Sequence, residues 1–188
     1  MFTIKEKRAL DKTEGWLWAS EGLRLAELAA QVPKTHWIVE LGSHLGRSSG
    51  YLAAGARKGK GAKLVCIDAW GGEGRLETFK SNMERLEVLD QITIVQAMTE
   101  DAFKKFNKKK KIGLLFIDAE HLYDPTLREY QEWSPLIPIG GWLAFHDSRH
   151  QEKDWPDVER VVADHVTPSG EWEAADYVET LWTGKRIR

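Results

Sequence analysis

The feature that most constrains the fold is a series of short apolar runs that are nearly continuous rather than alternating with polar residues. Five such runs occur, at residues 37–41, 64–67, 92–95, 114–117 and 142–145. An unbroken apolar run of this length indicates a β-strand that is covered on both faces, because a strand with one wet face would alternate. The chain is therefore expected to contain a buried, largely parallel sheet.

Segments with helical spacing separate the apolar runs. Apolar side chains recur at intervals of three and four residues over 76–86, 127–134 and 158–166. Strands that alternate with helices indicate βαβ units, whose right-handed crossovers build a parallel sheet with helices on both faces. Two later segments, 172–177 and 180–182, are expected to pair as a hairpin. We predict an α/β fold: a doubly wound, mostly parallel, seven-stranded Rossmann-like sheet with a C-terminal antiparallel edge hairpin.

The length of 188 residues fits one domain better than two. We expect a single domain over residues 1–188, in which residues 1–34 form an N-terminal accessory helical segment. Its amphipathic helix is expected over residues 15–31 and should end before Pro33.

The composition argues against several classes of protein. The formal net charge is only −2 and charges of both signs are interspersed, which argues against a nucleic-acid-binding surface. No apolar run is long enough for a membrane span, and residues 1–12 lack the apolar stretch of a signal peptide. The single cysteine, Cys66, cannot form an internal disulfide, and its apolar neighbours indicate a reduced, buried thiol. These features favour a soluble, cytoplasmic protein.

Ligands of open α/β sheets bind at the carboxyl ends of the strands, so the residues that follow each run are the candidate site. The first run leads through Glu40 into a glycine turn that contains Gly42, Ser43, His44 and Gly46. The two glycines would let the backbone approach a ligand, and the amides at the helix start favour an anionic group. The dinucleotide fingerprint G-x-G-x-x-G is broken, because His44 stands at its second glycine. Taken alone, the turn could also be a plain tight corner.

The second and third runs end in further polar residues. Asp68 follows the second run, and its carboxylate can accept hydrogen bonds from two ribose hydroxyls; the alternative is a turn or capping aspartate. After the third run, Ala97 and Thr99 could frame an adenine, although Thr99 could equally be the N-cap of the next helix.

The ends of the fourth and fifth runs carry the most specific chemistry. Asp118 and His121 follow the fourth run, and His146 and Asp147 follow the fifth. Neighbouring strands lie about 4.8 Å apart, so Asp118, His146 and Asp147 could converge on one divalent ion. The alternative is that each is an ordinary loop residue with locally satisfied hydrogen bonds.

Together these blocks resemble the class I S-adenosylmethionine methyltransferases, in particular the small O-methyltransferase-like family of the methyltransferase family 24 type, which is often associated with sugar and glycan modification. The resemblance rests on VELGSHLGRSSGYLA, VCIDAW and LLFIDAEHLYDPTLREYQEWSPLIPIGGWLAFHDS, in that order and spacing. It implies that Glu40 and the glycine turn hold the methionine part of the cofactor and that Asp68 holds the ribose. The residues expected to contact S-adenosylmethionine are Glu40, Gly42, Ser43, Gly46, Ser48, Asp68, Ala69, Trp70, Ala97, Thr99 and Asp118.

The resemblance also implies a metal. Metal-dependent relatives place an aspartate after the fourth strand, an acidic or amide pair after the fifth, and a base three residues beyond the first aspartate. Those positions hold Asp118, His146 with Asp147, and His121. We therefore expect a divalent metal (Mg, Mn or another ion) on Asp118, His146 and Asp147, with His121 and Asp118 as catalytic residues and His121 as the general base. His146 departs from the pattern, since these relatives usually have a carboxylate there.

The predicted function is S-adenosylmethionine-dependent, metal-assisted O-methylation of a small-molecule or sugar hydroxyl. The alternatives are an NAD-dependent oxidoreductase, a non-catalytic S-adenosylmethionine- or nucleotide-binding domain, and an iron-dependent oxygenase that uses the two histidines and one aspartate. Residues 71–75 and 148–156 could roof the acceptor, and Trp16 and Trp18 could overhang a ligand site instead of packing in the core. Self-association into a homo-oligomer is left open.

Overall fold

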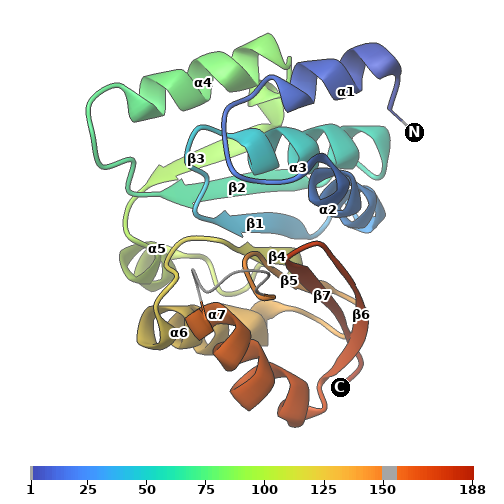
Figure 1. Ribbon diagram of the computed structural model, residues 1–188, viewed down its shortest axis with the longest axis vertical. Coiled ribbons are helices and arrows are strands. Elements are labelled where there is room, and N and C mark those ends of the chain that lie inside the picture. The colour runs from blue at the N-terminus through green and yellow to red at the C-terminus, as the bar shows by residue number, and fades with distance from the viewer. Residues whose placement is uncertain (1, 150–155) are drawn as a thin grey trace.

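The computed structural model describes residues 2–149 and 156–188. Within this part of the chain, seven strands form one sheet in the order β3-β2-β1-β4-β5-β7-β6 (Figure 1). Strands β1 to β5 pair in parallel, and β7 runs antiparallel to both of its neighbours. The predicted α/β class, doubly wound sheet and antiparallel edge hairpin are confirmed. The strands are β1 (Trp37–Leu41), β2 (Lys63–Asp68), β3 (Ile92–Gln96), β4 (Ile112–Ile117), β5 (Trp142–Phe145), β6 (Trp172–Val178) and β7 (Leu181–Arg186).

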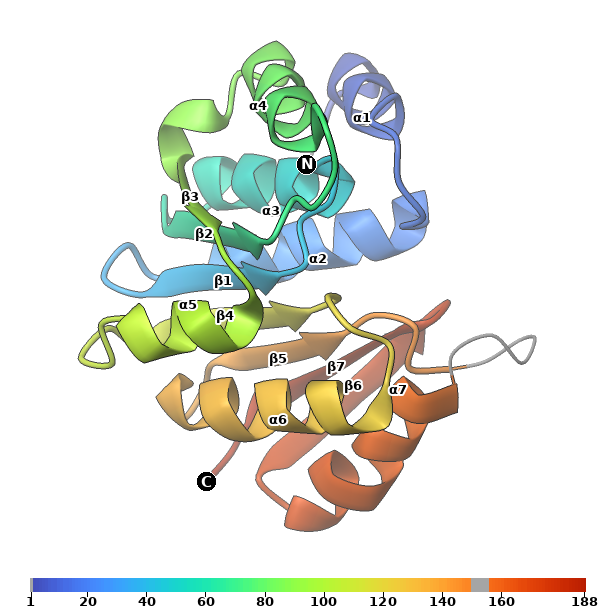
Figure 2. The ribbon, with the colours of Figure 1, turned by 90° about the vertical axis from the view of Figure 1, so that its left-hand side faces the viewer.

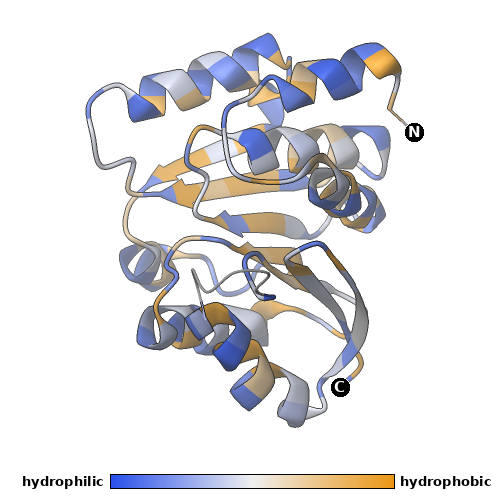
Figure 3. Ribbon diagram, viewed as in Figure 1, coloured by the Kyte–Doolittle hydropathy of each residue, from blue (hydrophilic) through white to orange (hydrophobic). Residues whose placement is uncertain are grey.

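Helices cover both faces of the sheet, as Figure 2 shows. One face carries α1 (Ile4–Asp11), α2 (Ala19–Gln31), α3 (Arg47–Lys58) and α4 (Arg75–Arg85), and the other carries α5 (Thr99–Lys105), α6 (Tyr123–Trp133) and α7 (Pro156–Val161). Each face has its own apolar core, with Leu52 and Phe79 in the first and Trp133 and Phe145 in the second. The strands form the apolar centre between these helices (Figure 3). Among the described residues, no helix has the length and apolar character of a membrane span.

The N-terminal segment differs from the single helix predicted over residues 15–31. Helix α2 begins only at Ala19, because Trp18 adopts an extended backbone at the N-cap. A separate helix, α1, precedes it and was not predicted. It is stabilised by a capping box in which the Thr3 hydroxyl accepts the Glu6 N–H and the Glu6 carboxylate accepts the Thr3 N–H.

The sheet register brings the carboxyl ends of neighbouring strands to one edge. Leu41 pairs with Ile67 on β2 and with Ile117 on β4, and Ile117 also pairs with Phe145 on β5. The residues that follow these positions stand in one row across the sheet: Gly42, Asp68, Asp118 and His146.

Candidate active site

A cavity of about 970 Å³ lies along this row of strand ends. Small-molecule sites typically measure about 300–1,000 Å³, so the cavity has room for a cofactor together with an acceptor. Its wall on one side is built by residues 14–18 and 179–180. The predicted site residues that line it are Gly42, Ser43, Ser48, Asp68, Ala69, Ala97, Thr99, Asp118, His121, His146 and Asp147. One cavity therefore collects side chains from the ends of five strands.

Three predicted cofactor-binding residues lie behind the cavity surface rather than on it. Glu40 is fully buried, where its carboxylate accepts hydrogen bonds from the hydroxyls of Ser43 and Ser49. Burial raises the pKa of the Glu40 carboxyl above its ordinary value. Gly46 forms the N-cap of α3 in the left-handed region, and Trp70 is 3% exposed. These residues support the glycine turn from behind.

Asp68 fastens the glycine turn to the end of β2. Its Oδ2 accepts the N–H of Ser43 at 3.0 Å and the N–H of His44 at 2.9 Å, and its Oδ1 accepts the N–H of Trp70 at 2.6 Å. A carboxylate offers about four lone-pair sites, so Asp68 can still accept hydrogen bonds from ribose hydroxyls. The structure thus gives Asp68 the turn-stabilising contacts of the alternative interpretation, and its ribose contact stays a prediction.

The capping role considered for Thr99 is wrong. Met98 has the extended backbone of the N-cap, and Thr99 is the first residue of α5. The Thr99 hydroxyl instead donates to Oε1 of the buried Glu129 at 2.7 Å. Thr99 still lines the cavity next to Ala97, on the side where an adenine was predicted.

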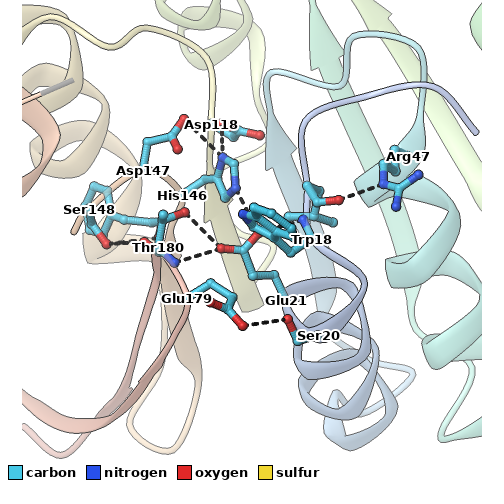
Figure 4. Close-up of polar contacts among 12 residues, drawn as sticks. Trp18, Ser20, Glu21, Arg47, Asp118, His146, Asp147, Ser148, Glu179 and Thr180 are labelled. Atoms are coloured by element: carbon cyan, nitrogen blue, oxygen red, sulfur yellow. Dashed lines mark hydrogen bonds and ion pairs between the residues drawn. The ribbon is translucent and has the colours of Figure 1, made fainter. Parts of the chain in front are cut away.

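Two aspartates and two histidines, here called the acid–histidine cluster, gather at the ends of β4 and β5: Asp118, His121, His146 and Asp147. Figure 4 shows Asp118, His146 and Asp147. Nδ1 of His146 lies 3.2 Å from Oδ1 of Asp118 and 3.2 Å from Oδ2 of Asp147. Nε2 of His121 lies 3.5 Å from Oδ1 of Asp118 and 3.1 Å from Oδ2 of Asp147. The other ring nitrogen of His146 is 3.1 Å from Oε2 of Glu21, so His146 lies between Glu21 and the two aspartates.

The aspartates and histidines of this cluster stabilise each other's charge. Burial alone would raise the pKa of the aspartates, but the two imidazoles hold the pKa of Asp118 and of Asp147 below the ordinary value. Burial alone would lower the pKa of the histidines, but the two carboxylates raise the pKa of His121 to about 9 and that of His146 well above its ordinary value. At neutral pH His121 therefore carries a proton in this arrangement.

The donor set fits a divalent cation. One ligand atom each from Asp118, His121 and Asp147 lies within 4.8 Å of the others, and two carboxylates with an imidazole suit magnesium, manganese, zinc or iron. The sequence predicted His146 as the third ligand and His121 as the base. In the structure the third member of this group is His121. His146 is 5% exposed and has Glu21 on its outer nitrogen. An imidazole must be neutral to bind a metal, so a cation would compete with the proton on His121.

Glu21 is a site residue that the sequence reasoning missed. It is fully buried, and its Oε1 accepts the N–H and the hydroxyl of Thr180 at 2.9 and 2.8 Å. The available signal was an acidic residue three positions after the N-cap Trp18, a capping pattern. Nothing in that pattern shows that the start of α2 lies against the end of β5.

Trp16 and Trp18 lie at the cavity rather than in the core, and their contact with a ligand stays a prediction. Both side chains are exposed, and both line the cavity. Of the segments proposed as a roof, Arg75 and Arg149 also line the cavity, whereas residues 150–155 lie outside the described residues.

Comparison with known proteins agrees with this geometry. A family model described as a methyltransferase domain matches residues 39–148, more than half of the chain. The fold and this match define a class I S-adenosylmethionine-dependent methyltransferase. Within that class, the chain belongs to methyltransferase family 24.

Solved methyltransferase structures share the fold. The O-methyltransferase from Bacillus cereus in complex with SAH is 17% identical, with a TM-score of 0.72 over 97% of this chain and 88% of that chain. TomG from Streptomyces achromogenes, an O-methyltransferase involved in tomaymycin synthesis, in complex with SAM, is 17% identical, with a TM-score of 0.70 over 98% and 87%. CalS11, a TDP-rhamnose 3'-O-methyltransferase of calicheamicin biosynthesis, is 16% identical, with a TM-score of 0.65 over 97% and 79%.

Proposed function

We propose that this methyltransferase transfers a methyl group from S-adenosylmethionine to a hydroxyl group of a small molecule or sugar, assisted by a divalent cation. The observation that carries the proposal is that the glycine turn and Asp68 share one cavity with Asp118, His121 and Asp147. Residues for holding the cofactor and residues for activating an oxygen are therefore next to each other. We also propose that the chain acts as a single domain, since Leu10 of α1 packs in the same core as the sheet.

The cofactor side of the cavity is formed by the ends of β1, β2 and β3. Ser48 lies in the first turn of α3, where the helix dipole favours the carboxylate of the methionine part. Asp68 would accept the ribose hydroxyls, and Ala97 and Thr99 line the side that would hold the adenine. Glu40 acts from behind by orienting Ser43.

The acceptor side is formed by the ends of β4 and β5. When bound, S-adenosylmethionine would supply a methyl group on a sulfonium sulfur: the acceptor oxygen bonds to the methyl carbon in line as the carbon–sulfur bond breaks, and S-adenosylhomocysteine is the leaving group. Holding the two reactants in line contributes of the order of 7–11 kcal/mol in favourable cases. The carboxylates of Asp118 and Asp147 would hold the cation, which would lower the pKa of a coordinated hydroxyl, with His121 beside them as the base rather than as a ligand. Nε2 of His121 is the proposed proton acceptor once it has lost the proton that the aspartates stabilise.

The named relatives support oxygen as the acceptor atom. The structures from Bacillus cereus and Streptomyces achromogenes are O-methyltransferases, and CalS11 acts on the rhamnose of a nucleotide sugar. Sugar and other small-molecule hydroxyls are therefore the acceptors to test.

Calorimetry with S-adenosylmethionine and with NAD tests the cofactor. We expect micromolar binding of S-adenosylmethionine, no binding of NAD, and at least about tenfold weaker binding in Asp68→Asn, because both the turn and the ribose lose an ionic acceptor. The matched control is Asp101→Asn, an exposed aspartate on α5. Preference for NAD would overturn the proposal, and cofactor binding without transfer to any hydroxyl would favour the non-catalytic alternative.

A further inference from the structure

Two large indole rings stand exposed at one wall of the cavity. Trp16 is 81% exposed and Trp18 is 62% exposed, and both line the cavity. Single exposed apolar side chains are common, but apolar rings that share the wall of a cavity indicate a surface for a ligand. Leu17, between them, is 5% exposed and belongs to the core. The segment 16–18 therefore directs one side chain inward and two tryptophans outward.

The exposure of these tryptophans does not come from a loosely held segment. The N–H of Trp18 donates to Oε2 of Glu21 at 2.9 Å, and the carbonyl of Leu17 accepts from Nε of Arg47 at 2.7 Å. The Arg47 guanidinium also donates to the carbonyl of Thr13 at 2.7 Å. The main chain around Trp18 is thus attached to α2 on one side and to α3 on the other, which fixes the point from which each indole extends.

The two tryptophans lie next to different parts of the cavity. The Trp16 ring is 5.0 Å from the ring of His44, which belongs to the glycine turn. The Trp18 main chain is bonded to Glu21, and the same carboxylate contacts His146 of the acid–histidine cluster (Figure 4). Trp18 is therefore the tryptophan on the side of the proposed oxygen chemistry.

The charged side chains that line the cavity limit the charge of the ligand that it can bind. The Arg47 guanidinium donates to main-chain carbonyls, and Arg75 and Arg149 also line the cavity, with Arg149 over the ring of Tyr177. Together with Arg47 and the imidazoles of His121 and His146, whose pKa is raised, these arginines nearly balance the carboxylates of the cavity, so a strongly charged acceptor is not favoured. The carboxylates that line the cavity are Glu14, Asp68, Asp118, Glu120, Asp147 and Glu179.

We propose that residues 15–18 form the acceptor-binding wall and that Trp18 stacks on an uncharged, hydroxyl-bearing ring. The shared chemistry is a flat apolar ring face, which is offered by a phenol or by the C–H face of a sugar. Stacking on Trp18 leaves the ring hydroxyl facing the cluster of Asp118, His121 and Asp147. This inference rests on the proposed methyl transfer and adds the part of the chain that selects the acceptor.

The test measures binding of three neutral probes to the protein saturated with S-adenosylhomocysteine: resorcinol, methyl α-rhamnopyranoside and glycerol. We expect at least one ring probe to bind more tightly than glycerol, and the better of the two identifies the ring class. Trp18→Ala should weaken that binding roughly tenfold and raise the acceptor KM, whereas Trp18→Phe should retain most of it. Affinity for S-adenosylmethionine should change less than about twofold. The control is Ile139→Ala, which removes an exposed apolar side chain outside this cavity.

Three results would contradict the proposal that Trp18 binds the acceptor ring. They are no preference for either ring over glycerol, unchanged ring binding in Trp18→Ala, and an equal loss of S-adenosylmethionine binding in that variant. The last result would place Trp18 against the cofactor instead. Failure of the unmodified protein to bind S-adenosylmethionine would contradict the proposed function itself, and is measured separately.

Discussion

Gly42 packs directly against the main chain of Asp118, so closely that a Cβ added to Gly42 would overlap the Asp118 carbonyl oxygen. The N–H of Asp118 donates to the carbonyl of Leu41 at 2.8 Å, which holds the ends of β1 and β4 together at this point. The glycine turn that would hold the cofactor is therefore in direct contact with the aspartate that would hold the cation. A substitution in the glycine turn is therefore expected to affect the cation site, and a substitution at Asp118 is expected to affect cofactor binding.

Gly42→Ala should damage both stability and cofactor binding. Gly42 has φ +86°, and Gly140 has φ +85° but nothing within 4 Å of an added Cβ. Gly140→Ala is thus a control with the same backbone strain, expected at about 1–3 kcal/mol, and without the clash. We expect a larger loss of unfolding free energy in Gly42→Ala and weaker S-adenosylmethionine binding in that variant alone, measured by denaturant titration and calorimetry. Equal losses of unfolding free energy in the two variants would show that the close contact of Gly42 with Asp118 does not contribute to stability.

Removal of the cation should lower the transfer rate if the acid–histidine cluster holds a metal. We expect chelation to reduce activity, manganese or magnesium to restore it, and Asp147→Asn to abolish the restoration while S-adenosylmethionine still binds. Manganese binding followed by electron paramagnetic resonance gives a readout that is independent of activity. Asp101→Asn is the control, and full activity after exhaustive chelation would contradict the metal.

Glu129 should make stability fall as the pH rises. Burial raises the pKa of Glu129 to about 8, although the hydrogen bond from Thr99 opposes this shift. Unfolding returns the carboxyl to its ordinary pKa of 4.5, so between these values the unfolded chain binds fewer protons than the folded one. The contribution of the protonated Glu129 carboxyl to the free energy of unfolding is complete below about pH 4.5 and is lost by about pH 8.

Glu129→Gln should remove this dependence. We expect the variant to gain of the order of 1–3 kcal/mol over the wild type between about pH 5 and pH 8, measured by urea unfolding at several pH values. Glu132→Gln on the same helix is the control and should leave the slope unchanged. Parallel pH curves for wild type and Glu129→Gln would rule out the buried, protonated carboxyl.

Arg47→Lys should loosen the tryptophan segment without unfolding the protein. A lysine cannot reproduce the guanidinium contacts to the carbonyls of Asp11, Thr13 and Leu17. We expect faster amide hydrogen exchange over residues 12–18, read by mass spectrometry. Arg57→Lys, on the same helix but bonded to Glu87 and Asp90, is the matched control and should leave this segment protected.

The fold could be predicted because its elements leave local signals. The buried runs, the glycine turn and the polar residues at strand ends all follow from short stretches of sequence, and parallel pairing then places Asp68 beside the turn that contains Ser43. Helix α1 was missed because its eight residues carry only one buried side chain, Leu10, so its apolar periodicity is weak.

The partners within the site could not be predicted in the same way. Glu21 and His146 are 125 positions apart, and their contact depends on how α2 packs against the sheet. Likewise, the choice between His121 and His146 as a ligand depends on side-chain direction, and both follow the same kind of strand end. Tertiary packing, rather than local pattern, sets these contacts.

The segment matched by the family model, residues 39–148, contains the strand ends that would bind the cofactor and the cation. Trp16 and Trp18 of the acceptor-binding wall lie before this segment, and Thr180, which contacts Glu21, lies after it. The proposed acceptor-binding wall thus lies in the flank before the family segment, and Glu21, which holds it, is in turn held by Thr180 of the flank after that segment. Exchanging both flanks together, rather than either one, is the change that would retarget such an enzyme and leave its transfer chemistry intact.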